Sequence, residues 1–402
     1  MDRFLFLLVL CVFTINFSLA ELPEDRPQGM EKPRVFISTD LGGDDEDDMQ
    51  TMVRYLIYAD MFETEAIVAS PPKAGRKEDI VRIINIYEKD YNYLKTWSWY
   101  PTPESLRNVT KQGASGTGAP GAGKNTEGSD YLITRAQVDD PRPLWVITWG
   151  SLTDVAQAIY DEPTIKSKIR LYSIGSWNTR MDQAARDYIA SEHKDELWWI
   201  ENDVTFRGMY QTGDLSGNYS NTTFVNKLVA PYGNLGAFYK SLKAGVLKEG
   251  DSPSMLYILS PLLGFAGDVD DPTAESWGGQ FRLTDATNHY QDLTTENASD
   301  NSKSKQTVSK WRKEFADHFA NRMKWTETTN PDALPDTTTV PDTCYTSDQL
   351  DSYDTCDVIS VHYKGQNINN NRDLQFFREH FGFMFSKDGK FYDFKGRKTS
   401  EE

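Results

Sequence analysis

Short apolar runs alternate with segments of helical periodicity along the first half of the chain. Met49, Met52, Val53, Leu56 and Ile57 recur at positions i, i+3, i+4, i+7 and i+8, which predicts an amphipathic helix. Strands are predicted at 35–37, 66–69, 144–148, 169–174 and 197–200, and further helices at 77–95, 152–159 and 180–191. This alternation predicts an α/β fold with a mostly parallel, Rossmann-like sheet that helices cover on both faces.

Changes in composition divide the chain further. Residues 1–20 combine a positive start, an apolar run and small residues before position 21, as a secretory signal peptide does. The alternative is a membrane anchor, but the run is shorter than the roughly 20 apolar residues that span a bilayer. Residues 112–128 are rich in Gly, Ala, Ser and Thr and predict a long flexible loop. Residues 326–343 are rich in Thr, Pro and Asp and predict a linker to a small C-terminal extension at 344–402.

The mature chain has further features of an exported protein. Four sequons predict N-glycosylation, at Asn108, Asn218, Asn221 and Asn297. Only Cys344 and Cys356 remain once the signal peptide is removed. In an oxidising compartment we expect a disulfide bond between them, with two free thiols as the alternative. The sequence therefore predicts a secreted protein.

The charge balance limits the classes of partner. The formal net charge is −17 at pH 7, which argues against a nucleic-acid partner and against binding to anionic membrane surfaces. The chain has no Gly-x-Ser-x-Gly elbow and no His-Glu-x-x-His motif, so neither serine-hydrolase nor zinc chemistry is expected.

The densest acidic cluster follows the first predicted strand. Residues 40–48 contain six acidic side chains around a Gly-Gly pair and precede the amphipathic helix. In an open parallel sheet this position is the carboxyl edge, where ligands bind. A solvated helix start is the alternative, because the helix dipole favours acidic residues there. That alternative explains two or three carboxylates better than six, and Ca²⁺ prefers clustered hard oxygen ligands, so the cluster predicts a calcium site.

The same segment carries a family resemblance. Thr-Asp-x-Gly followed by Asp-Asp, within 39–48, resembles the N-terminal signature of nucleoside hydrolases. More closely, residues 34–54 resemble the nucleoside-hydrolase-like domain of secreted, cellulose-associated proteins. Other segments resemble that domain or the nucleoside hydrolases themselves in the same order along the chain, at 123–129, 149–154, 199–208, 249–254, 276–279 and 311–325. The resemblance covers about residues 33–325 and implies a nucleoside-hydrolase-like domain over that range.

The resemblance implies a calcium site and a catalytic base. Asp40, Asp48 and Asp251 would bind Ca²⁺ through carboxylates, and Trp149 would bind it through its backbone carbonyl. Asp40 would also accept a proton from the water that attacks the anomeric carbon of an N-glycosidic bond. This chemistry is sensible, because a metal ion lowers the pKa of water and a neighbouring carboxylate is a usable base.

The resemblance also implies residues that bind substrate. Asp47 would bind ribose hydroxyls. The loop has two extra residues after Asp40, so Asp44 is an alternative for Asp47 or Asp48 in either role. The remaining implied substrate-binding residues are Asn178, Glu201, Asn202 and Asp203. For the last three, a turn or a helix cap is the alternative.

Two positions depart from the nucleoside-hydrolase pattern. Ser38 stands where many members carry another Asp, and Gly250 stands where many carry a His that protonates the leaving base. Some members instead stack the base between indoles. The candidates for such stacking are Trp177, Trp198, Trp199 and Trp277, with core packing as the alternative for each.

Two functions are therefore expected from the sequence. The first is a secreted, calcium-dependent hydrolase of N-glycosidic bonds acting on a nucleoside or ribosyl substrate. The alternative is a non-catalytic protein on the same fold that binds carbohydrate, such as cellulose or another cell-wall polysaccharide. A two-carboxylate hydrolase of O-glycosides is a third possible class. The sequence identifies no particular carboxylate pair for it, because the acidic residues are too numerous for one pair to stand out.

Overall fold

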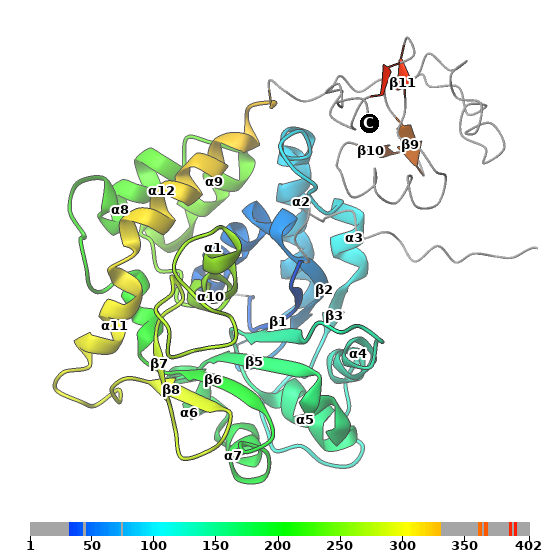
Figure 1. Ribbon diagram of the computed structural model, residues 1–402, viewed down its shortest axis with the longest axis vertical. Helices are drawn as coiled ribbons and strands as arrows, with labels where there is room; N and C mark the ends of the chain where they lie inside the picture. Colours follow the sequence, from blue (N-terminus) through cyan, green and yellow to red (C-terminus); the bar gives the residue numbers. More distant parts are fainter. Residues whose placement is uncertain are drawn as a thin grey trace, which may run out of the picture.

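An eight-stranded sheet forms the centre of the described chain (Figure 1). The computed structural model describes residues 32–42, 46–73 and 75–330, together with the backbone of four short strands between 361 and 391. The strand order is β3-β2-β1-β4-β5-β6-β8-β7, and every neighbouring pair is parallel except β7 with β8. The strands are β1 Arg34–Thr39, β2 Glu63–Ala69, β3 Thr110–Gln112, β4 Leu144–Thr148, β5 Ile169–Ile174, β6 Trp198–Asn202, β7 Phe281–Leu283 and β8 His289–Asp292.

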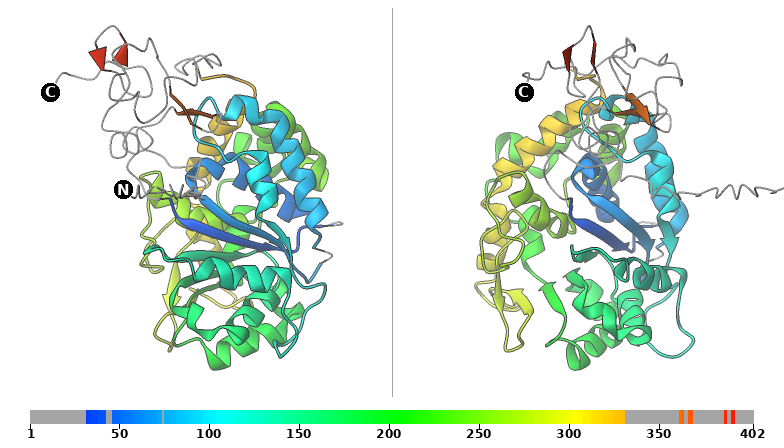
Figure 2. Two further views of the ribbon diagram at one scale, coloured as in Figure 1. Left: turned by 90° about the vertical axis from the view of Figure 1, so that its right-hand side faces the viewer. Right: turned by 45° about the vertical axis from the view of Figure 1, so that its right-hand side comes forward.

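Helices cover both faces of this sheet, so the predicted α/β class with a mostly parallel sheet is confirmed (Figure 2). One face packs against α4, α5 and α7, and the other packs against α1, α2, α10 and α12. The helices are α1 Glu46–Ile57, α2 Lys77–Leu94, α3 Pro103–Asn108, α4 Glu127–Ala136, α5 Thr153–Asp161, α6 Trp177–Met181, α7 Gln183–Glu192, α8 Asn221–Phe224, α9 Gly233–Ser241, α10 Ser252–Leu262, α11 Ser302–Ser309 and α12 Arg312–Met323.

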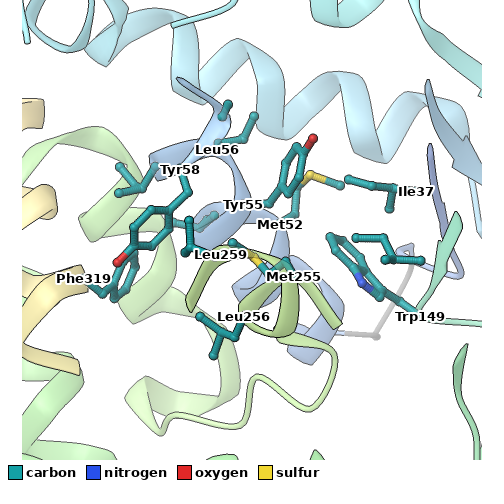
Figure 3. Packing of buried hydrophobic residues seen from close by; sticks show 14 of the residues in the cluster. Ile37, Met52, Tyr55, Leu56, Tyr58, Trp149, Met255, Leu256, Leu259 and Phe319 are labelled. Atoms are coloured by element: carbon teal, nitrogen blue, oxygen red, sulfur yellow. The ribbon is translucent and has the colours of Figure 1, made fainter. Parts of the chain in front are cut away.

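The strands are buried on both faces, which explains why their sequences are continuous apolar runs. In β1, Val35 and Ile37 enter the core with α1 and α10, whereas Phe36 enters the core on the opposite face. Figure 3 shows the first of these cores, where the indole of Trp149 lies close to Ile37 and Met255. Apolar burial of this kind supplies most of the free energy that holds such a sheet together.

Two predicted elements differ from the structure. The helix predicted at 180–191 is divided into α6 and α7 at Asp182, whose backbone leaves the helical region with φ −129° and ψ 47°. The Asp182 carboxylate instead accepts hydrogen bonds from Leu152 N and Thr153 Oγ1 at the start of α5. The loop predicted at 112–128 is shorter at both ends, because β3 includes Gln112 and Thr126 caps the start of α4.

Several sequence predictions concern residues outside the described part of the chain. These are the signal peptide at 1–20, Asp44, most of the linker at 326–343, and Cys344 and Cys356. Two antiparallel strand pairs are described within 344–402, formed by β9 Val361–Tyr363 with β10 Gln366–Ile368 and by β11 Ser386–Lys387 with β12 Lys390–Phe391. No helix in the described ranges is long and apolar enough to cross a membrane.

A buried ion pair joins α1 to the loop that precedes α10. The side chains of Arg54 and Glu249 are both 0% exposed, and the Arg54 Nε–H donates to Glu249 Oε2. Tyr239 and Ser252 donate hydroxyl hydrogen bonds to the two oxygens of the same carboxylate. The Arg54 guanidinium also lies 3.9 Å from the centroid of the Phe319 ring, which stabilises the cation by a cation–π contact.

Removal of one charge from this pair is expected to destabilise the fold strongly. We expect Glu249→Gln to lower the free energy of unfolding by about 3–5 kcal/mol, because Arg54 would be left buried and uncompensated. The measurement is urea unfolding followed by circular dichroism. Glu88→Gln is the matched control, because it breaks the pair with Arg107, in which the Glu88 side chain is 54% exposed. The control should change the free energy by about 0–1 kcal/mol, and equal losses in the two variants would contradict the assignment.

Candidate functional site

The candidate site lies at the carboxyl edge of the sheet, at the point where the strand order reverses. The chain proceeds outward from β1 through β2 to β3, then returns to place β4 on the other side of β1, which makes the β1–β4 junction a topological switch point. Asp40 follows β1 and Trp149 follows β4. A Cβ added at Gly150 would lie 2.9 Å from the Asp40 Cβ, so these two segments pack in direct contact. Two of the residues predicted from the sequence therefore meet here.

Asp40 and Asp48 are both buried at this junction, with exposures of 1% and 4%. Asp40 Oδ2 accepts a hydrogen bond from Lys73 N at 3.2 Å. Asp48 Oδ1 accepts a hydrogen bond from Thr39 Oγ1 at 2.6 Å, and Thr39 Oγ1 in turn accepts one from Leu41 N at 3.0 Å. The hydroxyl of Thr39 therefore ties the end of β1 to the first turn of α1. Buried carboxylates need such donors or a cation, because burial of an uncompensated charge is costly.

A hydrogen-bond chain joins Trp149 to the distant Asp251. The Trp149 indole Nε1–H donates to Ser254 Oγ at 2.9 Å, and Ser254 Oγ–H donates to the Asp251 backbone carbonyl at 2.7 Å. Asp251 is 5% exposed and directly precedes α10. The backbone carbonyl of Trp149, the expected calcium ligand, accepts a hydrogen bond from Asn178 Nδ2 at 2.7 Å. Asp251, Trp149 and Asn178 are thus connected although they are far apart in the sequence.

Asp47 pairs with two lysines that the sequence analysis did not identify. Its carboxylate lies 3.1 Å from Lys243 Nζ and 3.2 Å from Lys248 Nζ. Burial alone would raise the pKa of Asp47, but the two ammonium groups outweigh this effect and lower it. Lys243 belongs to a turn, Leu242–Gly245, in which Lys243 and Ala244 have positive φ. No local sequence signal indicates that this turn lies against α1.

Glu201 lies in a hydrogen-bonded network of its own. Its carboxylate is 1% exposed and accepts two hydrogen bonds from Arg186, at 2.6 and 2.7 Å, and one from Gln291 at 2.8 Å. His289 Nε2 lies 3.2 Å away. Burial opposes ionisation, but these partners hold the pKa of Glu201 down at about 2. The described partners of Glu201 include none of the other predicted site residues, so its geometry fits a structural role.

Asn202 and Asp203 end β6 and hold the following turn. Asn202 Oδ1 accepts a hydrogen bond from Phe206 N at 2.9 Å, and its Nδ2 donates to the Tyr172 hydroxyl at 2.9 Å. This is the turn-capping arrangement weighed as the alternative. Asp203 differs, because its Oδ1 accepts from Ser176 N at 2.5 Å in the segment that leads to Asn178.

The donors expected for Ca²⁺ have suitable chemistry, because they are three carboxylates and a backbone carbonyl. Ser38 and Thr148 face each other across β1 and β4, and both hydroxyls are buried without a hydrogen-bond partner among the described residues. Such orphaned polar atoms mark a place where a polar ligand or water fits. Within the described ranges, however, no three acidic, His or Cys side chains are gathered closely enough to hold an ion. The donor chemistry fits Ca²⁺, whereas the described residues alone do not form its coordination shell.

An aromatic ring lies next to Gly250, the position where many nucleoside hydrolases carry a histidine. A Cβ added at Gly250 would lie 3.3 Å from Cδ2 of Phe206, so the Phe206 ring packs close to this backbone position. Of the indoles considered for stacking, Trp199 and Trp277 are fully buried and Trp198 packs against the core. Trp177 is 39% exposed, and Lys73 Nζ lies 5.4 Å from its ring centroid. Among these four indoles, Trp177 is therefore the one available to a ligand. The sequence analysis did not identify Phe206, because Phe206 lies in a turn with no distinctive motif.

The sequons differ in accessibility. Asn108, Asn218 and Asn297 are exposed. Asn221 is half-buried, and its Nδ2 donates a hydrogen bond to the Tyr210 carbonyl at 2.8 Å. A glycan on Asn221 would replace one proton of this amide, so Asn221 is the least suitable acceptor of the four.

The fold resembles known structures. A nucleoside hydrolase-related hypothetical protein from Saccharophagus degradans that is associated with carbohydrate metabolism superimposes with a TM-score of 0.59 at 26% identity, over 76% of this chain and 74% of that chain. A purine-preferring ribonucleoside hydrolase from Gardnerella vaginalis gives a TM-score of 0.42 at 14% identity, over 72% of this chain and 99% of that one. An inosine-uridine preferring nucleoside hydrolase from Bacillus anthracis gives 0.43 at 15% identity, over 73% and 99%. These two distant similarities support no conclusion about substrate.

The family assignment comes from the sequence. No curated protein matches the chain. The family model described as "Cellulose-binding Sde182, nucleoside hydrolase-like domain" matches residues 34–281, which include Asp40, Trp149, Asn178, Asp203 and Asp251. This match covers more than half of the chain, and the protein therefore belongs to the family of cellulose-binding Sde182 proteins with a nucleoside hydrolase-like domain.

Proposed function

We propose that this protein is a secreted, calcium-dependent hydrolase of N-glycosidic bonds that acts on a nucleoside or ribosyl compound. The observation that carries the proposal is the connection of Asp40, Trp149 and Asp251 at the switch point of a nucleoside-hydrolase-like sheet. Ligands bind at this point in open α/β sheets, and a buried acidic site there is costly unless it binds something. The apolar run at 1–20 and the exposed sequons support secretion.

Different residues would bind the metal ion, accept the proton and bind the sugar. Asp40, Asp48, Asp251 and the Trp149 carbonyl would hold Ca²⁺, with Asp44 as a further candidate ligand, and a bound ion would lower the pKa of the attacking water and orient the sugar hydroxyls. Asp40 accepts the proton of that water. Asp47 accepts hydrogen bonds from ribose hydroxyls, and its two lysine partners keep it ionised.

Neighbouring groups complete the binding site. The Asn178 amide fixes the direction of the Trp149 carbonyl by its 2.7 Å hydrogen bond. The exposed face of Trp177 offers a stacking surface for the base or the sugar. Glu201 and Asn202 support the strand end through their own partners rather than by direct contact with substrate.

A second candidate is a non-catalytic protein that binds cellulose or another cell-wall polysaccharide. The family description itself favours it. Gly250 also removes the imidazole that would protonate a leaving base, while Trp177 keeps an exposed face. The hydrolase remains our first choice because the buried carboxylates at the switch point supply both the oxygen ligands and the base that hydrolysis uses.

Calcium is expected to stabilise the protein against thermal unfolding. A ligand at one hundred times its Kd adds about 2.7 kcal/mol when it binds only the folded state. We expect this gain for the wild-type chain after chelator treatment and readdition of Ca²⁺, measured by calorimetry. Asp40→Asn and Asp251→Asn should abolish it, whereas Asp195→Asn, at an exposed turn, should keep it. An undiminished gain in Asp251→Asn would remove Asp251 from the ligand set.

Loss of the base is expected to slow hydrolysis without preventing folding. Asp40→Asn should lower kcat for inosine by at least about 10²–10⁴-fold, the usual contribution of a positioned general base, because the same substitution also removes a proposed Ca²⁺ ligand. The measurement is release of hypoxanthine by chromatography, with Asp195→Asn as the control. Full activity in Asp40→Asn would show that another group takes the proton.

Retention on insoluble cellulose tests the second candidate. If polysaccharide binds at this edge of the sheet, Trp177→Ala should reduce retention by about 5–150-fold, corresponding to the loss of about 1–3 kcal/mol of ring stacking. Tyr93→Ala is the matched control, because Tyr93 is 41% exposed on α2. No retention of the wild-type protein, or equal losses in both variants, would count against carbohydrate binding at Trp177.

A further inference from the structure

Four consecutive residues after β5 connect separate parts of the candidate site. A Cβ added at Gly175 would lie 2.1 Å from Asp203 Oδ1, so this carboxylate packs directly against the backbone. Ser176 N donates a hydrogen bond to the same oxygen at 2.5 Å. Trp177 is exposed, and Asn178 holds the Trp149 carbonyl. The segment therefore joins Asp203 to the switch point.

Ser176 has a strained backbone, with φ 60° and ψ −104°. A non-glycine residue in such a conformation costs of order 1–3 kcal/mol and persists only where its surroundings impose it. Here Ser176 N is bound to Asp203, while its Oγ donates to Glu296 at 3.1 Å and accepts from Arg207 Nη2 at 2.6 Å. Strain of this kind concentrates at functional sites, and in this structure the strained residue is the one whose N–H binds Asp203 Oδ1.

Only one oxygen of Asp203 is used within the described structure. Ser176 N and the more distant Thr179 Oγ1, at 3.5 Å, both approach Oδ1. The backbone N–H of Asp203 donates to Asp292 Oδ2 at 2.7 Å, which fixes the end of β6. Asp203 is half-buried and follows β6 at the carboxyl edge of the sheet, and its Oδ2 has no hydrogen-bond partner among the described residues.

The surroundings of Asp203 favour its protonated form. Burial, together with the charges of Glu201 on β6 and Asp292 on β8, raises the pKa of Asp203 to about 6. The Ser176 N–H and Arg186 on α7 oppose this shift without cancelling it. Beyond Ser176, Glu296 forms ion pairs with Arg207 at 2.6 Å and with Arg180 at 3.1 Å. A carboxyl group with this pKa is suited to give up a proton near neutral pH.

We propose that Asp203 donates the proton that the leaving group requires, in place of the histidine that is absent at Gly250. This inference rests on the proposed hydrolase function. As the C–N bond breaks, its electron pair goes to the leaving nitrogen, which takes the proton of Asp203. The attacking water forms the new C–O bond and gives its proton to Asp40. One proton then returns from Asp40 to Asp203 through solvent, and the site is restored.

The position of Asp203 is consistent with this role. Asp40 contacts the Trp149 turn through Gly150, and Asp203 reaches the carbonyl of the same turn through the Gly175–Asn178 segment. The two carboxyl groups thus follow different strands, β1 and β6, at the same edge of the sheet. Single-displacement hydrolysis of a glycosidic bond uses one carboxyl group as the acid and another as the base.

Two substrates with different leaving groups test the inference. Hypoxanthine leaves inosine with a proton, whereas 4-nitrophenolate leaves 4-nitrophenyl β-ribofuranoside without one. For the wild-type protein, kcat/KM for inosine should fall tenfold per pH unit above about pH 6, because the required acid is lost as it deprotonates. Activity on the nitrophenyl riboside should show no such decline. The wild-type profiles alone can contradict the proposal, even if a variant fails to fold.

Asp203→Asn should then lower kcat/KM for inosine by about 10²–10⁴-fold and change the nitrophenyl reaction little. Asp182→Asn is the matched control, because burial also raises the pKa of Asp182 to about 6 while its carboxylate caps α5. The control should leave the ratio of the two activities unchanged. Equal losses on both substrates in Asp203→Asn, or no loss, would overturn the role of Asp203. Failure of the wild-type protein on both substrates would overturn the proposed function and this inference together.

Discussion

The ion pair between Arg54 and Glu249 is the interaction on which the candidate site depends. It is fully buried, so it exists only because Tyr239, Ser252 and the Phe319 ring compensate for the lost water. Its two ends belong to the helix that carries Asp48 and to the loop that carries Asp251. Neither segment is a neighbour of the other in sequence, and the sheet alone does not hold them together. This buried pair therefore ties the helix of Asp48 to the loop of Asp251.

The sheet supplies the second constraint. Parallel strands deliver every loop that follows them to one edge, and the reversal of order at β1 and β4 opens a gap there. Asp40, Trp149, Asn178 and Asp203 follow β1, β4, β5 and β6 in turn. Three consecutive residues at the end of β6 make different contacts. Glu201 accepts hydrogen bonds from Arg186 and Asn202 accepts one from the backbone of Phe206, whereas only Oδ1 of Asp203 accepts hydrogen bonds within the described structure. In our proposal, neighbouring residues at one strand end thus divide into structural residues and one proton donor.

The sequence predicts those parts of the site whose residues are close together along the chain, and it does not predict contacts between remote segments. The β1–α1 unit and its acidic residues are contiguous, so periodicity and charge identify them. Asp251 and Trp149 were reached only through the family resemblance, because no local pattern reveals a contact between remote loops. The division of the predicted 180–191 helix depends on Asp182 capping α5, which is a tertiary effect. The positive φ of Ser176 and the pairing of Lys243 with Asp47 leave no trace in composition or periodicity.

The contact between Gly250 and Phe206 also limits substitution at position 250. Because a Cβ at position 250 would already lie 3.3 Å from the ring, a full imidazole fits only if Phe206 moves or becomes smaller. The two positions are therefore structurally coupled, and the effect of a substitution at position 250 on the loop next to Asp251 depends on the residue at position 206.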